Sequence, residues 1–318
     1  MAPAVSVILP TRNRADQLRK TLADVDALTA PPGLTWEVVV IDNGSTDQTP
    51  AVAAVVADLD RRSPGRFRCV AEPVAGRSSA LNAGVKAAAG QLLLFVDDDV
   101  HIEPDWLTEM TRAFAEERCL AAGGKILPVF LAGPPAWLAP GAPFPYRYDL
   151  GQTRHDTIAV FGANMGFRRE VFERFGLFRD DLGIAPGDPM VGEESELCER
   201  IRKGGGRVLY VPTAVVHHPV TAQQASQAFL LTWHFHYGRS LARREPVPAG
   251  TVWWLDVPRY LWRDLVEHWI RWLFASGAPV RFQHRLSIKR LWGEAVERRA
   301  LRRWENRIFM AANRPGVS

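Results

Sequence analysis

The chain has 318 residues, of which 47% are hydrophobic and 23% are charged, an ordinary composition for a folded, soluble protein. This length allows one large domain with an appendage. The three cysteines, Cys69, Cys119 and Cys198, are an odd number and are widely spaced, without a CxxC pair. They argue against a disulfide framework or a zinc site and indicate the reduced thiols of a cytoplasmic protein.

Neither a secretory signal nor a membrane span is expected. The start, MAPAVSVILPTRNR, lacks a basic segment followed by a long apolar one. The longest uncharged stretch, residues 126–146, contains six prolines and therefore cannot form a spanning helix. We expect a cytoplasmic protein, with association with the inner face of the membrane left open.

Charge is unevenly distributed along the chain. The net charge is +4, but residues 239–318 contain 16 Lys and Arg against 7 Asp and Glu, a local charge of +9. Residues 1–238 contain 23 against 28, a local charge of −5. This asymmetry predicts a mildly acidic body followed by a basic C-terminal region.

Strands and helices alternate over the first hundred residues. Short apolar, β-branched runs predict strands at 5–10, 36–42, 67–72 and 91–97. Helices are expected at 14–28, 51–62 and 78–90, the last beginning at Ser78 or Ser79 and ending at Gly90. The alternation predicts an α/β fold with βαβ units and a parallel sheet flanked by helices.

Polar residues follow three of the expected strands. They are Pro10, Thr11 and Arg12 after the first strand, Asp42 and Asn43 after the second, and Asp97, Asp98 and Asp99 after the fourth. Ligands of such sheets bind beyond the carboxyl ends of the strands. These side chains are therefore expected at the rim of a binding site.

The three consecutive aspartates, Asp97 to Asp99, need a physical explanation because like charges repel. One carboxylate would be enough to cap the following helix, and Asp105 lies nearer to its start. A divalent cation would relieve the repulsion, because Mg²⁺ and Mn²⁺ take oxygen ligands and often share them with substrate phosphates. The cluster therefore favours a metal and nucleotide site over simple capping.

Several motifs in a fixed order resemble the family 2 glycosyltransferases. They are VILPTRNR, VVVIDNGSTD, GRSSALNAG, FVDDDV, FGANMGFRREVFERFGLF, GEESELCERI and VVHHPV, and they span roughly residues 4–240. The resemblance implies the GT-A fold, with a mostly parallel sheet flanked by helices and a C-terminal helical extension. It implies a catalytic domain at 1–238, whose nucleotide-sugar half is about 1–105 and whose acceptor half is 106–238, followed by a basic, Trp-rich region at 239–318.

The resemblance also implies which residues contact the donor nucleotide. They are Pro10, Thr11, Arg12, Asp42, Asn43, Gly76, Arg77, Asn82, Asp97 and Asp98. Asp42 matches the carboxylate that accepts from the base, which favours UDP- or dTDP-sugars through their imide N–H. Asp42-Asn43-Gly44 is also a good turn, and Asn82 could be an ordinary polar residue of a helix. Leu81 stands where the family often has arginine.

The metal ligands implied by the family are Asp99 and His218, holding Mn²⁺ or Mg²⁺. Adjacent side chains of a strand point to opposite faces, so only one of His217 and His218 can reach the cation. His218-Pro219-Val220 fits the family pattern better. A lone histidine is more often structural than a ligand, which leaves both histidines open as alternatives.

The acceptor side and the catalytic base follow from two further motifs. Gly162, Ala163 and Asn164 match the segment where acceptor and diphosphate approach, and a plain loop is the alternative. Glu194 falls on the position of the general base, with Glu193 before it. The family usually has Glu-Asp here, so the base carries one additional methylene. An acid-rich helix start would give the same pattern.

These implications describe an inverting, metal-dependent glycosyltransferase with Glu194 as its base. The alternatives are a nucleotidyltransferase, although PTRNR lacks the glycines of a phosphate loop, and a catalytically degenerate sugar-nucleotide-binding or scaffold protein. The expected partners are a nucleotide-sugar donor and a hydroxyl acceptor, namely a glycan, a lipid-linked sugar or a small molecule. Nucleic acid is not expected, because the basic residues belong to no known module.

The Trp-rich region contains an amphipathic helix within residues 251–275. Arginines recur at i, i+4 spacing on one side, and apolar and aromatic residues occupy the other. Such a helix either packs on the domain or across a homodimer, or it lies on an anionic membrane surface. Both alternatives remain open at this stage.

Overall fold

The computed structural model describes residues 3–46, 49–138 and 141–312, without the side chains of 49–52 and 307–312. The chain forms two compact units. The sheet unit comprises Met1–Gly133, Pro143–Asp188 and Glu193–Val220, and the helical unit comprises Pro134–Ala142, Pro189–Gly192 and Thr221–Ser318. The helical unit thus begins before residue 239, because the helix α7 (Gln227–Arg244) belongs to it.

The first half of the sheet unit has the alternation that the sequence predicts. Its elements are β1 (Val5–Thr11), α1 (Ala15–Asp26), β2 (Trp36–Asp42), α2 (Thr49–Arg62), β3 (Phe67–Ala71), α3 (Arg77–Ala87) and β4 (Leu92–Val96). β1, β2 and β4 are almost entirely buried, as expected for strands covered on both faces, whereas β3 is only partly buried.

One detail of that prediction is wrong. Helix α3 begins at Arg77, with Gly76 at its N-cap position, and it ends at Ala87. Neither Ser78 nor Ser79 caps it. The hydroxyl of Ser78 is used elsewhere, because it donates to the carbonyl oxygen of Leu182 at 2.7 Å.

The second half of the sheet unit adds two long strands, several short ones and three helices. Its elements are β5 (His101–Ile102), α4 (Trp106–Ala113), β6 (Cys119–Phe130), β7 (His155–Asp156), β8 (Asn164–Arg168), α5 (Glu170–Phe175), β9 (Ile184–Ala185), β10 (Asp188–Pro189), α6 (Glu193–Lys203) and β11 (Arg207–Val220). The central sheet has the order β3-β2-β1-β4-β8-β6-β11-β5, with β7 also paired to β11.

Strand direction brings the polar strand ends to one edge of the sheet. β1 pairs in parallel with β2 and β4, and β2 pairs in parallel with β3. β8 is antiparallel to β4 and to β6, and β11 is parallel to β6. β11 therefore runs in the same direction as β4, so the carboxyl ends of β1, β2, β4 and β11 share an edge.

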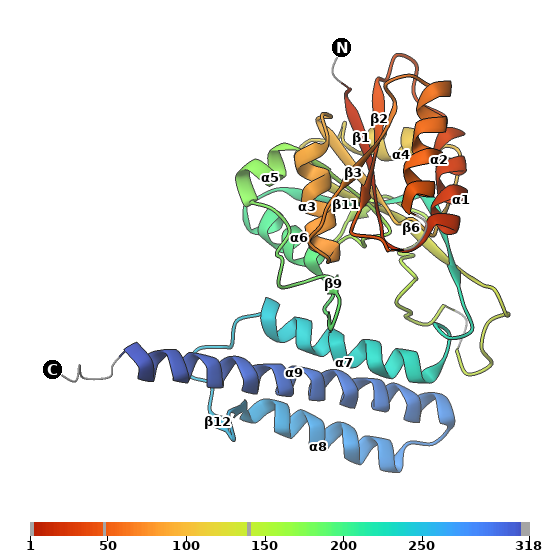
Figure 1. Cartoon of the computed structure of the whole chain (residues 1–318). Coiled ribbons are helices and arrows are strands. Elements are labelled where there is room, and N and C mark those ends of the chain that lie inside the picture. Colours follow the sequence, from red (N-terminus) through yellow and green to blue (C-terminus); the bar gives the residue numbers. More distant parts are fainter. Residues whose placement is uncertain (1–2, 47–48, 139–140, 313–318) are drawn as a thin grey trace. The chain divides into compact units, whose positions relative to one another are not determined.

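Helices flank the mostly parallel sheet on both faces (Figure 1). An apolar cluster lies on each face. On one face, α1 and α4 contribute Leu18, Leu22, Trp106 and Met110. On the other face, α3, α5 and α6 contribute Leu81, Val85, Phe172 and Leu197. The expected α/β class with helices on both faces is confirmed.

The helical unit consists of α7, a short hairpin of β12 (Trp253–Trp254) and β13 (Val257–Pro258), α8 (Arg259–Phe274) and α9 (Ala278–Ala312). Figure 1 shows α9 between α7 and α8. The backbones of α7 and α9 approach closely at Gly238, where a Cβ atom would lie 1.8 Å from the carbonyl oxygen of Arg290. Glu297 of α9 accepts from Arg239 and Arg243 of α7 at 2.8 and 2.7 Å.

The C-terminal helical extension predicted from the sequence is therefore present. Among the helices that the structure describes, none combines the length and the apolar character needed to cross a membrane.

Candidate active site

Two arginines compensate the three aspartates that follow β4. Arg14, at the start of α1, donates to Asp98 at 3.0 Å and to Asp99 at 2.7 Å. Thr11, the last residue of β1, also donates to Asp98 at 2.6 Å. Burial would lower the pKa of Arg14, but the charges of Asp99 and Asp98 raise it above its ordinary value. The sequence motif PTRNR contains this arginine, but only the structure reveals its role.

The second arginine, Arg77, joins the aspartates to α6. Its Nη2 lies 2.7 Å from Asp97 Oδ1, and its Nε donates to Glu193 Oε1 at 3.0 Å. Although burial lowers the pKa of Arg77, these two carboxylates raise it. Gly162 makes room for the guanidinium, because a Cβ atom there would lie 2.3 Å from Nη2. The predicted residues Arg77, Asp97, Gly162 and Glu193 are thus brought together.

The neighbouring aspartates respond differently to this environment. Burial would raise the pKa of Asp97, but Arg77 lowers it below its ordinary value. For Asp98, burial raises the pKa to about 6, with Asp99 adding to the effect and Arg14 opposing it. The cluster contains the three aspartates and Glu193 against the guanidinium groups of Arg14 and Arg77, which favours a further positive charge at this place.

Asp97, Asp99 and His218 could hold that charge as a metal ion. One ligand atom of each lies within 4.8 Å of the others. Oδ1 of Asp99 is buried and accepts no hydrogen bond from the residues that the structure describes, and His218 Nε2 lies 3.7 Å from it. Ligand atoms about 2.0–2.1 Å from one octahedral ion lie roughly 3–4 Å apart. The donor set of two carboxylates and an imidazole suits Mn²⁺ or Mg²⁺.

The orientation of His218 fits a ligand better than that of His217. Nδ1 of His218 lies 2.9 Å from the carbonyl oxygen of Pro219, which can only accept, so Nδ1 carries the proton and Nε2 presents a lone pair toward Asp99. The ring of Tyr146 packs on the imidazole, with centroids 4.4 Å apart. His217 points away and pairs with Glu103 at 2.7 Å.

A cavity of about 330 Å³ opens beside the carboxylates. Most of its lining was predicted to contact the donor: Pro10, Thr11, Arg12, Asn43, Gly76, Arg77 and Asp98. Its remaining lining is Arg14, Ala80 and the segment 184–186. Nη1 of Arg12 is buried without a hydrogen bond to any residue in the described part of the chain. An anionic ligand in this cavity would satisfy it.

The turn after β2 shapes one side of the cavity. The side chain of Asn43 donates to the carbonyl oxygens of Glu72 and Val74 and accepts from the backbone N–H of Gly76. It thereby fixes the loop that leads to Arg77. Asp42 is buried and accepts from the N–H of Ser45 at 3.0 Å through Oδ1. These contacts also agree with the alternative that Asp42 and Asn43 form a turn.

Glu193 and Glu194 open helix α6, on the side of the site opposite β4. Burial raises the pKa of Glu194 well above its ordinary value, and the adjacent negative charge of Glu193 raises it further. The charge of Glu194 in turn contributes to the raised pKa of Arg77, which indicates that the two side chains are close. A raised pKa makes the carboxylate of Glu194 a stronger proton acceptor than that of an ordinary glutamate.

Two predicted contact residues have their side chains engaged in the fold. The Asn164 amide donates to the carbonyl oxygens of Lys125 and Ala214 and accepts from the indole of Trp106, with the side chain fully buried. Asn82 donates to the carbonyl oxygen of Phe178 and to Asp180, and it accepts from the N–H of Phe178. Both amides hold backbone in place, and no pattern in the sequence indicates these partners.

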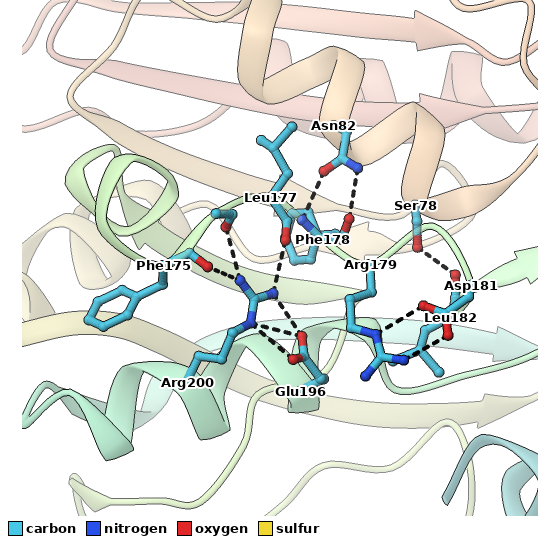
Figure 2. Close-up of polar contacts among 11 residues, drawn as sticks. Ser78, Asn82, Phe175, Leu177, Phe178, Arg179, Asp181, Leu182, Glu196 and Arg200 are labelled. Atoms are coloured by element: carbon cyan, nitrogen blue, oxygen red, sulfur yellow. Dashed lines mark hydrogen bonds and ion pairs between the residues drawn. The ribbon is translucent and has the colours of Figure 1, made fainter. Parts of the chain in front are cut away.

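Figure 2 shows how the segment 175–182 is fixed between α3 and α6. From α3, Asn82 binds the backbone of Phe178 and Ser78 binds that of Leu182. From α6, Arg200 donates to the carbonyl oxygens of Phe175, Gly176 and Leu177 and pairs with Glu196. Because α3 starts at Arg77 and α6 starts at Glu193, these contacts set the distance across the site.

Comparison with known proteins identifies the family of this site. The family model described as "Glycosyl transferase family 2" matches residues 6–176, more than half of the chain. The chain belongs to this family. It is therefore a glycosyltransferase, and the nucleotidyltransferase alternative is not supported.

Curated relatives of this glycosyltransferase include bacterial and archaeal proteins. Succinoglycan biosynthesis protein ExoM of Rhizobium meliloti is 27% identical over 240 residues, which cover 72% of each chain. Glucosyl-dolichyl phosphate glucuronosyltransferase of Haloferax volcanii is 25% identical, over 74% of this chain and 75% of the relative. O-antigen biosynthesis protein RfbC of Myxococcus xanthus is 27% identical, but the match spans only 18% of its length.

Solved structures confirm the fold. The mannosyltransferase PcManGT from Pyrobaculum calidifontis, in complex with GDP-Man and Mn²⁺, has a TM-score of 0.53 and 18% identity, covering the whole of this chain and 77% of the other. GalNAc-T7 with UDP, GalNAc and Mn²⁺ has a TM-score of 0.54 and 18% identity over 76% of this chain and 51% of the other. These likenesses establish the GT-A architecture of this glycosyltransferase.

Proposed function

We propose that this glycosyltransferase moves a sugar, with inversion at the anomeric carbon, from a nucleotide-diphosphate sugar to a hydroxyl acceptor, and that the reaction requires Mn²⁺ or Mg²⁺. The observation that carries the proposal is the convergence of Asp97, Asp99 and His218 beside the cavity. Arg77 and Asp98 connect the cavity with this group of metal-binding residues, because each lines the cavity and belongs to the same charged cluster.

The donor binds in the cavity of about 330 Å³ in this proposal. Asp42 accepts from the imide N–H of a uracil or thymine base, which favours UDP- or dTDP-sugars. The solved neighbours carry GDP-Man in one case and UDP in the other, so the preference rests on Asp42 alone. Arg12, whose Nη1 lacks a hydrogen bond among the described residues, faces the negative charge of the nucleotide.

Asp99 and His218 hold the cation, with Asp97 as the third group of the set. When bound, the cation neutralises the donor's diphosphate and stabilises it as a leaving group. The arginines that now pair with the aspartates, Arg14 and Arg77, are near enough to share the diphosphate charge. Gly162 matters here because any side chain would displace Arg77.

Glu194 is the general base. It takes the proton from the acceptor hydroxyl as that oxygen forms a bond to the anomeric carbon, and the bond from that carbon to the diphosphate oxygen breaks. Its raised pKa supports this role. The acceptor is a glycan, a lipid-linked sugar or a small molecule. Relatives named for succinoglycan and O-antigen biosynthesis support a glycan, and the relative named for glucosyl-dolichyl phosphate supports a lipid-linked sugar.

The test is a panel of UDP-, dTDP- and GDP-sugars, assayed for release of free nucleoside diphosphate with Mn²⁺, with Mg²⁺ and with EDTA. We expect release that requires a metal and is highest for a UDP- or dTDP-sugar. Asp99→Ala should reduce it by about a hundredfold or more, since even groups that only support a metal ligand are worth 10–100-fold. Asp105→Ala, at an exposed aspartate outside the cluster, is the control.

Full activity in EDTA or in Asp99→Ala would contradict the metal assignment. Metal-dependent nucleotide binding without turnover on any donor or acceptor would instead indicate a degenerate, sugar-nucleotide-binding protein. The anomeric configuration of the first product, read by NMR, tests inversion separately.

A further inference from the structure

Helix α8 has an apolar face that the fold does not use. Its members are Val266, Trp269, Ile270, Leu273 and Phe274, all exposed, with Phe274 at 84%. They follow the spacing i, i+3, i+4, i+7, i+8, so they form one continuous stripe along the helix. Contiguous exposed apolar patches on a protein surface mark interaction sites, whereas single exposed residues do not.

The stripe is not needed to hold α8 in place. A different face of the helix packs on α9, where Leu261 joins Leu291 and Ala295 in a small apolar cluster, with Leu265 against it. Among the residues that the structure describes, the helical unit therefore accounts for one apolar face of α8 and leaves the other exposed.

The hairpin before α8 extends the stripe. Trp262 lies one turn before Val266, and its indole donates to the carbonyl oxygen of Trp254 at 3.1 Å. Trp254 and Leu255 at the hairpin turn are themselves exposed, Leu255 by 62%. We call Trp254, Leu255, Val266, Trp269, Ile270, Leu273 and Phe274 together the α8 surface.

The hairpin turn presents its leucine at a conformational cost. Leu255 and Asp256 have φ angles of +53° and +62°, a region that favours glycine and asparagine in two-residue turns. A branched apolar residue there is unusual, and observed strain of this kind points toward function. Arg303 of α9 pairs with Asp256 at 2.9 Å, so the turn is held in this conformation.

Basic residues border the α8 surface. Arg259 and Arg263 are exposed on the first turns of α8, and Arg271 is exposed beside the stripe. Arg263 pairs with Asp264 at 2.8 Å and Arg271 with Glu267 at 2.6 Å, within the same helix. Arg281 donates to the carbonyl oxygen of Ala275 just after the helix. The whole stretch 239–318 carries a net charge of +9. Trp and Phe next to Arg is the composition of helices that lie in the headgroup region of anionic bilayers.

We propose that the α8 surface binds the surface of an anionic phospholipid bilayer, with its aromatic and aliphatic side chains inserted among the headgroups and its arginines on lipid phosphates. A second copy of the chain fits this surface less well. In a two-fold dimer the same patch meets itself, so the net positive charge of residues 239–318 would be brought against itself.

The full chain is mixed with vesicles of phosphatidylcholine alone and of phosphatidylcholine with phosphatidylglycerol, and binding is measured by co-sedimentation. We expect binding to the anionic vesicles that weakens with salt. Trp269→Ser with Phe274→Ser should weaken it by about tenfold or more, because each buried aromatic is worth about 1.5–3 kcal/mol and 1.4 kcal/mol is tenfold. Arg263→Glu with Arg271→Glu should weaken it selectively for the anionic vesicles.

Ile158→Ser, at a residue of the sheet unit that is 71% exposed, is the matched control and should leave binding unchanged. Circular dichroism melting of each variant verifies that it folds. Equal binding by wild type and the double serine variant, or no binding to anionic vesicles, would overturn the proposal. So would a dimer in light scattering that the serine variant abolishes. The experiment does not depend on glycosyl transfer, so its outcome and that of the donor assay are separable.

Discussion

The two units of this glycosyltransferase place their unusual side chains in opposite ways. The sheet unit buries charge, because Asp98 and Glu193 are buried, and Asp97 and its partner Arg77 are half-buried beside them. The helical unit exposes apolar groups, such as Trp269 and Phe274. Each arrangement costs free energy when the unit is considered alone. The difference supports the two proposals, a small charged ligand for the sheet unit and an extended surface for the helical unit.

The largest effect should follow the loss of the proposed base. Glu194→Gln keeps the size of the side chain but removes its ability to accept a proton, so we expect kcat to fall by about 10²–10⁴-fold. Donor binding should change little, and isothermal titration with a nucleotide sugar and Mn²⁺ measures that. A variant that loses donor affinity but keeps kcat would move Glu194 from the base to the binding residues.

The pH dependence of kcat tests the proposed role of Glu194 as the base in a second way. A base acts in its deprotonated form, so activity rises as the pH increases through its pKa. Burial and the charge of Glu193 raise the pKa of Glu194, which should shift the rising limb of the kcat profile above the range of an ordinary glutamate. Glu194→Asp, which restores the Glu-Asp pattern usual in the family, should retain much of the activity. A profile without this limb would contradict the role.

The strands, helices and strand-end carboxylates were predictable because they depend on local pattern. Alternating apolar runs fixed β1 to β4, and parallel strands bring Thr11 and Asp99 to one edge of the sheet. The family resemblance also predicted His218 beside the carboxylates. The structure places it there because β11 runs in the same direction as β4, so both strands end at the same edge of the sheet.

What could not be predicted are partners distant in sequence. Arg14 bridging two aspartates, and Asn82 binding the backbone of Phe178, are contacts across many residues with no periodic signal. Asn164 in a GAN motif looks like a ligand contact, yet its amide is engaged by buried backbone. The exposure of the apolar face of α8 could likewise not be predicted from the sequence, because a helix that packs on its own domain has the same pattern.

A smaller effect tests how α6 holds the segment that connects it with α3. Arg200 of α6 holds three carbonyl oxygens of the segment 175–177 (Figure 2). Arg200→Ala would leave these acceptors without their donor, and we expect the free energy of unfolding to fall by about 2–4 kcal/mol. Urea denaturation measures it, with Arg202→Ala at an exposed arginine of the same helix as the control. Equal losses in the two variants would mean that the segment is held by other contacts.

The smallest effect concerns a polar group buried in the helical unit. Burial, with the positive charge of Arg290, lowers the pKa of His234 in α7 to about 4, and its Nδ1 has no hydrogen bond to the part of the chain described. An unfolded histidine titrates near 6.5, so stability is unaffected above that pH and falls as the pH drops from about 6.5 toward 4, because the unfolded state binds the proton first. The loss should be on the order of 1 kcal/mol per pH unit. His234→Gln should flatten this dependence in melting curves recorded across that range, whereas the exposed His155→Gln should not. Parallel curves for wild type and His234→Gln would show that the imidazole is solvated and that the helical unit does not bury a polar group at this place.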